Sequence, residues 1–148
     1  MCSAPVRAAI RLSSNRQEEL QLVPWVDLLS WADEIIVINQ GKIIQRDSAE
    51  EVYRSPVNEY AAALFGKYNA VSPALVQLFP SLQNDTKRFI RAGDFQVGFE
   101  TNGVEGRIIS VSFMGGFYEM EIAVPGSQLI ITHANSFRKG DVVYISLK

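Results

Sequence analysis

Two Gly-Lys pairs are candidates for a phosphate-binding site, because glycine and lysine together can hold phosphate groups. A phosphate loop reads G-x-x-x-x-G-K-[ST], and its backbone N–H groups and its lysine cradle the phosphates. Here Gly41-Lys42 and Gly66-Lys67 are not followed by Ser or Thr, and neither has a glycine five residues before its own glycine. The sequence therefore predicts no phosphate cradle, and we expect neither catalytic nor cofactor-binding residues.

Carboxylates and a histidine are the next residues to consider, as ligands of a metal. Asp33-Glu34 ends an apolar stretch, like the acidic pair of a magnesium-binding Walker B strand, but Ser30 and Trp31 interrupt that stretch. A helix fits better, because one helical face collects Trp25, Leu28, Leu29 and Ala32. His133 is the only histidine and Cys2 the only cysteine. These residues cannot complete a zinc site, so we expect no metal site.

A small anion site is a hypothesis for the glycine-rich segment Ser112, Met114, Gly115 and Gly116. Successive backbone N–H groups in such a turn can form an anion-binding concavity, to which the Ser112 hydroxyl could add a donor. The alternative is that Gly115-Gly116 only closes a β-hairpin, and the alternating residues on either side favour that interpretation.

Composition restricts the class of protein. The chain has 148 residues, 47% hydrophobic residues and a net charge of −2, which suits one ordinary domain or two small ones. A general nucleic-acid binder usually carries a basic excess. A single cysteine excludes an internal disulfide and favours a reducing compartment. No apolar run approaches the roughly 18 residues of a membrane helix. We therefore expect a cytoplasmic protein without direct membrane insertion.

The local sequence between residues 35 and 66 predicts a β-hairpin followed by two short helices. The apolar β-branched run Ile35–Ile38 and the run Lys42–Gln45 flank the turn residues Asn39-Gln40-Gly41. Ser48 is three residues before Glu51, which predicts a capped helix that ends before Pro56. Asn58 can cap a second helix that stops at Gly66.

From Lys87 onward, apolar and polar residues alternate with a turn signal every 8–12 residues, which predicts about six short strands. The strands are expected around Phe89–Arg91, Phe95–Phe99, Ile109–Phe113, Tyr118–Val124, Leu129–Ile131 and Val142–Ile145. Such spacing is typical of a small β-barrel. Residues 70–83, which contain Pro73 and Pro80, are expected to form a short helix or an irregular cover.

The segment from Ala32 to Gly66 resembles the end of the ATP-binding domain of ABC importers. The resemblance rests on Ala-Asp-x-Ile-x-Val, Asn-x-Gly-x-Ile-x-Gln, Glu-Glu-x-Tyr, Pro-x-Asn and Phe-Gly, in that order. It is closest to the subgroup serving polyamines, iron, maltose, sulfate or molybdate. The family's switch histidine should lie about ten residues before Asp33, where this chain has Val23, and the signature Leu-Ser-Gly-Gly-Gln is absent.

The later part of the chain resembles a TOBE domain, an OB-like barrel that follows the ATPase core in these importers. The matching segments are Val104–Gly115, Lys139–Val143 and Phe89–Asp94, where Ala92-Gly93 replaces the family's Pro-Glu. The resemblance implies an α+β, mainly β fold. It also implies two domains: residues 1–68 as a small α/β remnant of the ATPase domain, and residues 69–148 as an OB-like TOBE regulatory domain.

As a function, the resemblance implies the C-terminal regulatory and dimerisation region of the ATP-binding subunit of an ABC-type solute importer. ATP and Mg are cofactors of the parent family; none is expected in this chain, which should not be an enzyme by itself. The implied partners are a second copy of the chain and membrane-spanning permease subunits, with the protein cytoplasmic and peripheral to the membrane. The strands expected at a homodimer contact are Ile35–Ile38, left without the family's central sheet, and Val142–Leu147.

Two other functions remain open. The barrel alone could be a stand-alone oxyanion-binding module, as some TOBE domains bind molybdate or sulfate. It could also bind nucleic acid as an OB module, although residues 103–148 hold four basic and four acidic residues. Alternation places Glu119 and Glu121 on one strand face, where they would repel phosphates. We therefore expect no nucleic-acid partner.

Overall fold

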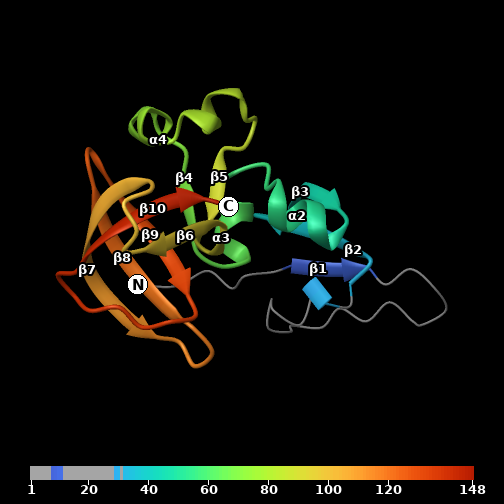
Figure 1. The fold of residues 1–148 in the computed structure, drawn as a ribbon. Helices are drawn as coiled ribbons and strands as arrows, with labels where there is room; N and C mark the ends of the chain where they lie inside the picture. The colour runs from blue at the N-terminus through green and yellow to red at the C-terminus, as the bar shows by residue number, and fades with distance from the viewer. Residues whose placement is uncertain (1–7, 12–28, 31) are drawn as a thin grey trace. The chain divides into compact units, whose positions relative to one another are not determined.

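The computed structural model describes residues 8–11, 29–30 and 32–148, and it divides into two compact units, Met1–Gly66 and Lys67–Lys148 (Figure 1). The helix expected around Trp25–Ala32 lies mostly outside the described residues. The assignment of residues 1–68 and 69–148 to two domains of the resembled family stays a prediction. Each unit is described by itself below.

The first unit contains a three-stranded antiparallel sheet in the order β1-β2-β3. Its strands are β1 (Ala8–Arg11), β2 (Glu34–Asn39) and β3 (Lys42–Asp47). The β2–β3 hairpin is the predicted one, and its turn residues Gln40 and Gly41 have φ of 50° and 75°, as hairpin turns matched to strand twist require. Because β1 and β3 flank β2, the expectation that Ile35–Ile38 offers an unpaired edge to a second copy is wrong.

Two capped helices follow the hairpin. In α2 (Ala49–Arg54), the Ser48 hydroxyl accepts a hydrogen bond from the Glu51 N–H at 3.3 Å. In α3 (Glu59–Leu64), the Asn58 side chain accepts from the Ala61 N–H at 2.9 Å. Both caps were predicted, because short polar side chains satisfy the free N–H groups of a first helical turn. The core of this unit gathers Ile35, Val37, Ala49, Val52, Ala61, Leu64 and Phe65.

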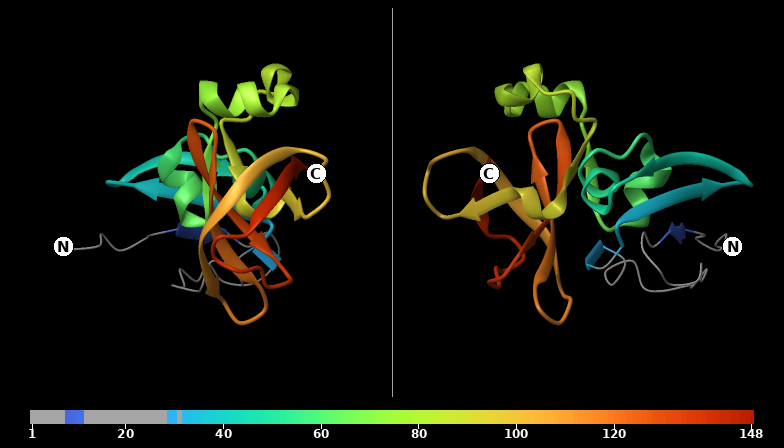
Figure 2. Two further views of the ribbon diagram at one scale, coloured as in Figure 1. Left: turned by 60° about the vertical axis from the view of Figure 1, so that its left-hand side comes forward. Right: turned by 90° about the vertical axis from the view of Figure 1, so that its right-hand side faces the viewer.

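The second unit is built on a five-stranded antiparallel sheet in the order β6-β10-β7-β8-β9. Its strands are β6 (Phe95–Gly98), β7 (Val104–Phe113), β8 (Tyr118–Val124), β9 (Ser127–His133) and β10 (Val142–Leu147). The sheet curls into a half-barrel (Figure 2), which confirms the mainly β, OB-like fold class. β10 pairs with β6 over Tyr144–Leu147 and with β7 over Val142–Ile145, so it lies inside the sheet, and its expected contact with a second copy stays a prediction.

A separate two-stranded ladder joins β4 (Tyr68–Ala70) to β5 (Phe89–Arg91). The predicted strand at Phe89–Arg91 therefore exists, but it pairs outside the half-barrel sheet. Between these strands lie α4 (Pro73–Leu78), which Ser72 caps, and a 3₁₀ turn over Pro80–Asn84. Of the two alternatives left open for residues 70–83, a short helix or an irregular cover, the structure shows the short helix.

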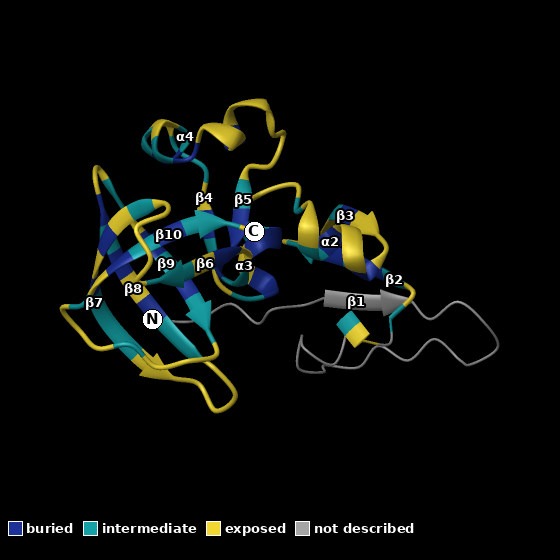
Figure 3. Ribbon diagram, in the orientation of Figure 1, coloured by how far each residue is buried: buried dark blue, intermediate teal, exposed yellow. Residues whose placement is uncertain are grey.

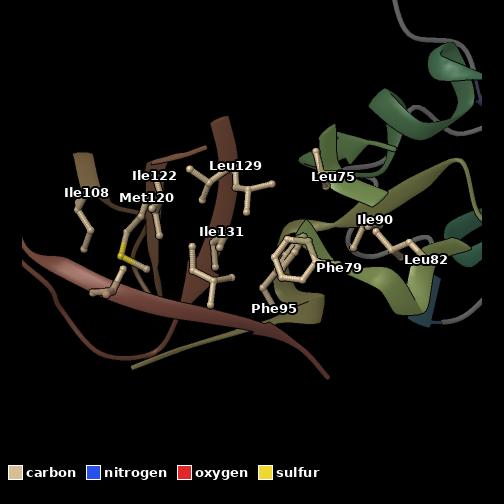
Figure 4. Close-up of a cluster of buried hydrophobic side chains, with 13 residues drawn as sticks. Leu75, Phe79, Leu82, Ile90, Phe95, Ile108, Met120, Ile122, Leu129 and Ile131 are labelled. Carbon is tan, nitrogen blue, oxygen red and sulfur yellow. The ribbon is translucent and has the colours of Figure 1, made fainter. Parts of the chain in front are cut away.

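The core of the second unit lies between the concave face of the sheet and this helical segment (Figure 4). Alternate residues of β8, Met120, Ile122 and Val124, are buried, whereas Glu121 between them is exposed (Figure 3). From the helical side, Phe79 meets Phe95 edge to face, with ring centroids 5.8 Å apart. The period-two pattern of the sequence therefore places one face of each strand in the core.

Candidate functional site

The residues of the predicted anion site lie together at the exposed tip of the β7–β8 hairpin. Gly115 has φ of 94°, and the Met114 N–H donates a hydrogen bond to the Phe117 carbonyl at 2.8 Å. That N–H therefore closes the hairpin. The Ser112 hydroxyl and the backbone N–H groups of Gly115 and Gly116 are the remaining candidate donors. The anion site therefore stays a prediction, with these groups as its possible donors.

The same tip presents large apolar side chains to solvent. Phe113 is 67% exposed, and Met114 and Phe117 are exposed as well. The Phe113 ring contacts the Tyr118 ring, with the two ring centroids 5.2 Å apart. The tip thus carries an exposed apolar surface beside the candidate donors of the predicted anion site.

A surface hollow of about 890 Å³ lies on the second unit. It is walled by β6, the loop after it, the end of β9 and alternate residues of β10: Phe95–Phe99, Glu100, Asn102, Thr132–Ala134, Tyr144, Ser146 and Lys148. The lining residues Tyr144, Ser146 and Lys148 alternate with Val143, Ile145 and Leu147, which belong to or pack against the core. Along β10 the hollow therefore lies on the face of the sheet that points away from the core. Its volume falls in the range of about 300–1,000 Å³ found for small-molecule sites.

Three aromatic rings stand at one end of this hollow. Phe99 and His133 line it, and both contact Phe137, with ring centroids 5.5 Å and 5.2 Å from that of Phe137. Phe137 in turn packs against the core of the second unit. The two lining rings are therefore held by a common ring that is anchored to the core.

His133 also organises the loop that follows β9. Its Nδ1 atom lies 3.0 Å from the backbone nitrogen of Asn135 and 3.3 Å from the carbonyl oxygen of the same residue. In the described part of the chain, no three His, Cys, Asp or Glu side chains gather closely enough to hold a metal ion. His133 is thus a wall of the hollow and a support of its loop.

Charge in the hollow is balanced. Its charged side chains, Glu100 and Lys148, are both exposed and of opposite sign. The Lys148 amine donates to the carbonyl of Gly93, so part of its hydrogen-bonding capacity is already used. The remaining polar groups are the carboxamides of Gln96 and Asn102 and the hydroxyls of Thr132, Tyr144 and Ser146.

Of the residues of this hollow, the sequence singles out His133, as a candidate metal ligand. Phe99 lies at the end of a predicted strand, and an apolar residue just beyond the last core position of a strand is a usable signal. Phe137 sits in a polar loop and gives no such signal. Its role follows from contacts with Phe99 and His133 that only the folded chain makes.

No helix in the described ranges has both the length and the apolar character needed to cross a membrane.

Comparison with known proteins bears on the family. The chain is 30% identical over 133 residues to y4fO of Sinorhizobium fredii, an uncharacterized ABC transporter ATP-binding protein, covering 85% of this chain and 39% of that relative. It is 23% identical over 137 residues to the spermidine/putrescine import ATP-binding protein PotA of Clostridium acetobutylicum, covering 82% of this chain and 39% of PotA. Its homologues are ATP-binding subunits of ABC importers.

A third homologue is the sulfate/thiosulfate import ATP-binding protein CysA of Synechocystis sp., 30% identical over 115 residues, or 70% of this chain and 32% of that relative. No protein-family model matches the chain. The chain spans about two fifths or less of the length of these ABC importer subunits.

Proposed function

We propose that this chain is the C-terminal region of the ATP-binding subunit of an ABC-type solute importer, and that it does not bind or hydrolyse ATP by itself. The similarity to such subunits carries this proposal, because it covers 85% of this chain but only 39% of the relative. The missing phosphate loop and signature motif are consistent with a region outside the catalytic centre.

Each unit has a role in this proposal. The β2–β3 hairpin with α2 and α3 matches the segment that closes the ATPase domain in the resembled family. The half-barrel corresponds to the TOBE domain, which in that family mediates contacts between the two ATPase subunits and can bind regulators. The chain would then act at the cytoplasmic side of the membrane, through permease subunits bound by the parent protein.

A chimera tests the importer role. The region of the Clostridium relative PotA that matches this chain is replaced by this chain, and spermidine-dependent uptake is measured in cells lacking PotA. A matched control deletes the same region. We expect the chimera to assemble with the permease and to restore uptake above the deletion. Uptake no better than the deletion, from a chimera that is folded and expressed, would contradict the proposal.

Nucleotide binding tests the catalytic part. A fluorescent ATP analogue titrated into the chain should show no micromolar binding, because backbone and lysine donors for the phosphates are missing from the sequence. Full-length PotA serves as the positive control in the same assay. Micromolar binding that unlabelled ATP competes away would show that this chain holds nucleotide.

A further inference from the structure

We propose that the hollow walled by β6, β9 and β10 binds a small planar heterocycle of the nucleobase class, as a free base or nucleoside. The volume of about 890 Å³ accommodates such a molecule. The proposal concerns this chain alone and does not depend on the importer role. Three features of the lining favour this chemistry: aromatic rings that are held by the core, carboxamide side chains, and charged side chains of opposite sign.

The aromatic end provides a stacking surface. Phe99 is 66% exposed, so much of its ring is open to solvent. Its ring is nevertheless held against Phe137, and Phe137 is held against His133 and the core. An exposed ring that is fixed in place offers a face to a ligand at little entropic cost. A planar π system is the ligand that gains most from such a face.

The polar groups suit the edge of a base. Gln96 and Asn102 carry carboxamides, each with a donor and an acceptor side by side. The same pair of groups lies on the edge of adenine and on other nucleobases, and Asn or Gln is a common partner for it. The Thr132 and Ser146 hydroxyls, also in the wall, can donate or accept toward a ribose.

The charged side chains of the hollow do not favour a phosphorylated ligand over an uncharged one. Glu100 and Lys148 are of opposite sign, and the Lys148 amine is engaged by the Gly93 carbonyl. A phosphate normally requires lysine or arginine together with converging N–H donors. The hollow therefore favours an uncharged base or nucleoside over a nucleotide or an oligonucleotide.

Titration of the isotopically labelled full chain with adenosine, guanosine and ribose, followed by NMR, tests the site. We expect saturable shifts of residues 96–102 and 132–134 with a nucleoside, at millimolar affinity or tighter, and none with ribose. Adenosine monophosphate should bind no tighter than adenosine. No saturable shift with either nucleoside, or shifts centred on the hairpin tip at residues 112–117, would overturn the proposal.

Two phenylalanines give a matched comparison. Phe99 is 66% exposed and Phe113 is 67% exposed. Of these two residues, Phe99 lines the hollow and Phe113 does not. Phe99→Ala should weaken nucleoside binding about tenfold or more, as loss of a stacking ring does, and Phe113→Ala should leave it unchanged. Phe99→Leu keeps an apolar side chain if the alanine variant fails to fold, and Phe99→Trp should retain binding. Equal loss in the Phe99 and Phe113 variants would contradict the assignment.

Discussion

Asn69 shows at the scale of a residue how a buried side chain can replace a strand. It is 6% exposed, its Nδ2 atom donates to the Ile130 carbonyl, and its Oδ1 atom accepts from the Ile130 N–H, both at 2.7 Å. These two bonds reproduce those that a neighbouring strand would make with the edge strand β9. The amide therefore satisfies one backbone pair at the open side of the sheet.

We expect Asn69→Leu to lower the free energy of unfolding by about 2–3 kcal/mol, because it leaves a buried N–H and carbonyl of Ile130 without partners. Urea unfolding followed by circular dichroism measures this. Asn84→Ala, at an exposed position, is the matched control and should stay within about 0.5 kcal/mol of the parent. A loss of the same small size in both variants would contradict this account of Asn69.

Gly103 is a second position where a single substitution should lower stability, because there is no room for a Cβ atom. Its φ is 128°, and a Cβ placed there would collide with the carbonyl of Ile145 in β10. Gly103→Ala should cost about 2–3 kcal/mol or prevent folding, since both the backbone conformation and the contact are unfavourable. Gly116→Ala is the control, because a Cβ at Gly116 meets nothing within 4 Å. Thermal unfolding that shows no difference between the two variants would contradict this prediction.

Among the described residues of the first unit, a buried side chain and an exposed ion pair are two of the connections between elements. Gln45 of β3 is 6% exposed and reaches the connection after α2, donating to the Ser55 carbonyl and accepting from the Val57 N–H, both at 3.1 Å. Arg46 pairs with Glu34 of β2 at 2.9 Å. The buried amide, unlike the exposed pair, cannot exchange its partners for water.

Gln45→Leu should therefore destabilise the first unit by about 1–3 kcal/mol, since it leaves the Val57 N–H unsatisfied. Gln83→Ala, at an exposed position of the 3₁₀ turn, is the control and should be near neutral. Hydrogen exchange localises the effect: protection should fall in β3, α2 and α3, while β7 and β8 are unchanged. A uniform fall across both units would argue against this role for Gln45.

The Arg46 pair has a defined pH dependence. The hydrogen bond and then the charge of Glu34 raise the pKa of Arg46 above its ordinary value. A raised pKa of a base contributes stability that is fully present below the unfolded pKa and is lost only as pH rises through the folded pKa. We therefore expect no contribution from Arg46 titration to changes in stability between pH 6 and 9, as a comparison with Arg46→Gln would show.

For the whole molecule, the proposed role in an importer subunit predicts a homodimer, since TOBE-type domains in the resembled family contact the partner subunit. Ile35–Ile38 pairs with strands on both sides within the described chain, and Val142–Leu147 is paired on each side over part of its length. Light scattering at low and high protein concentration should show twice the monomer mass at high concentration. A monomer mass throughout would rule the dimer out.

The sequence by itself determined the features that depend on neighbours a few residues apart. The turn at Gln40-Gly41, the caps at Ser48 and Asn58 and the alternation along β8 follow from local backbone sterics, local hydrogen bonds and the period of a strand. These predict element type because the groups involved are close in the chain whatever the overall fold. The order of the motifs also indicated the family.

Only the tertiary structure decided what depends on distant parts of the chain. The insertion of β10 between β6 and β7, the bonds from Asn69 to a residue 61 positions away and the Phe99–Phe137–His133 contacts have no local signal. Strand order and the hollow arise because every strand buries one face in a shared core. That core is formed by many segments that are far apart in the sequence. For that reason the alternating pattern predicted the strands, while the half-barrel and its hollow required the folded chain.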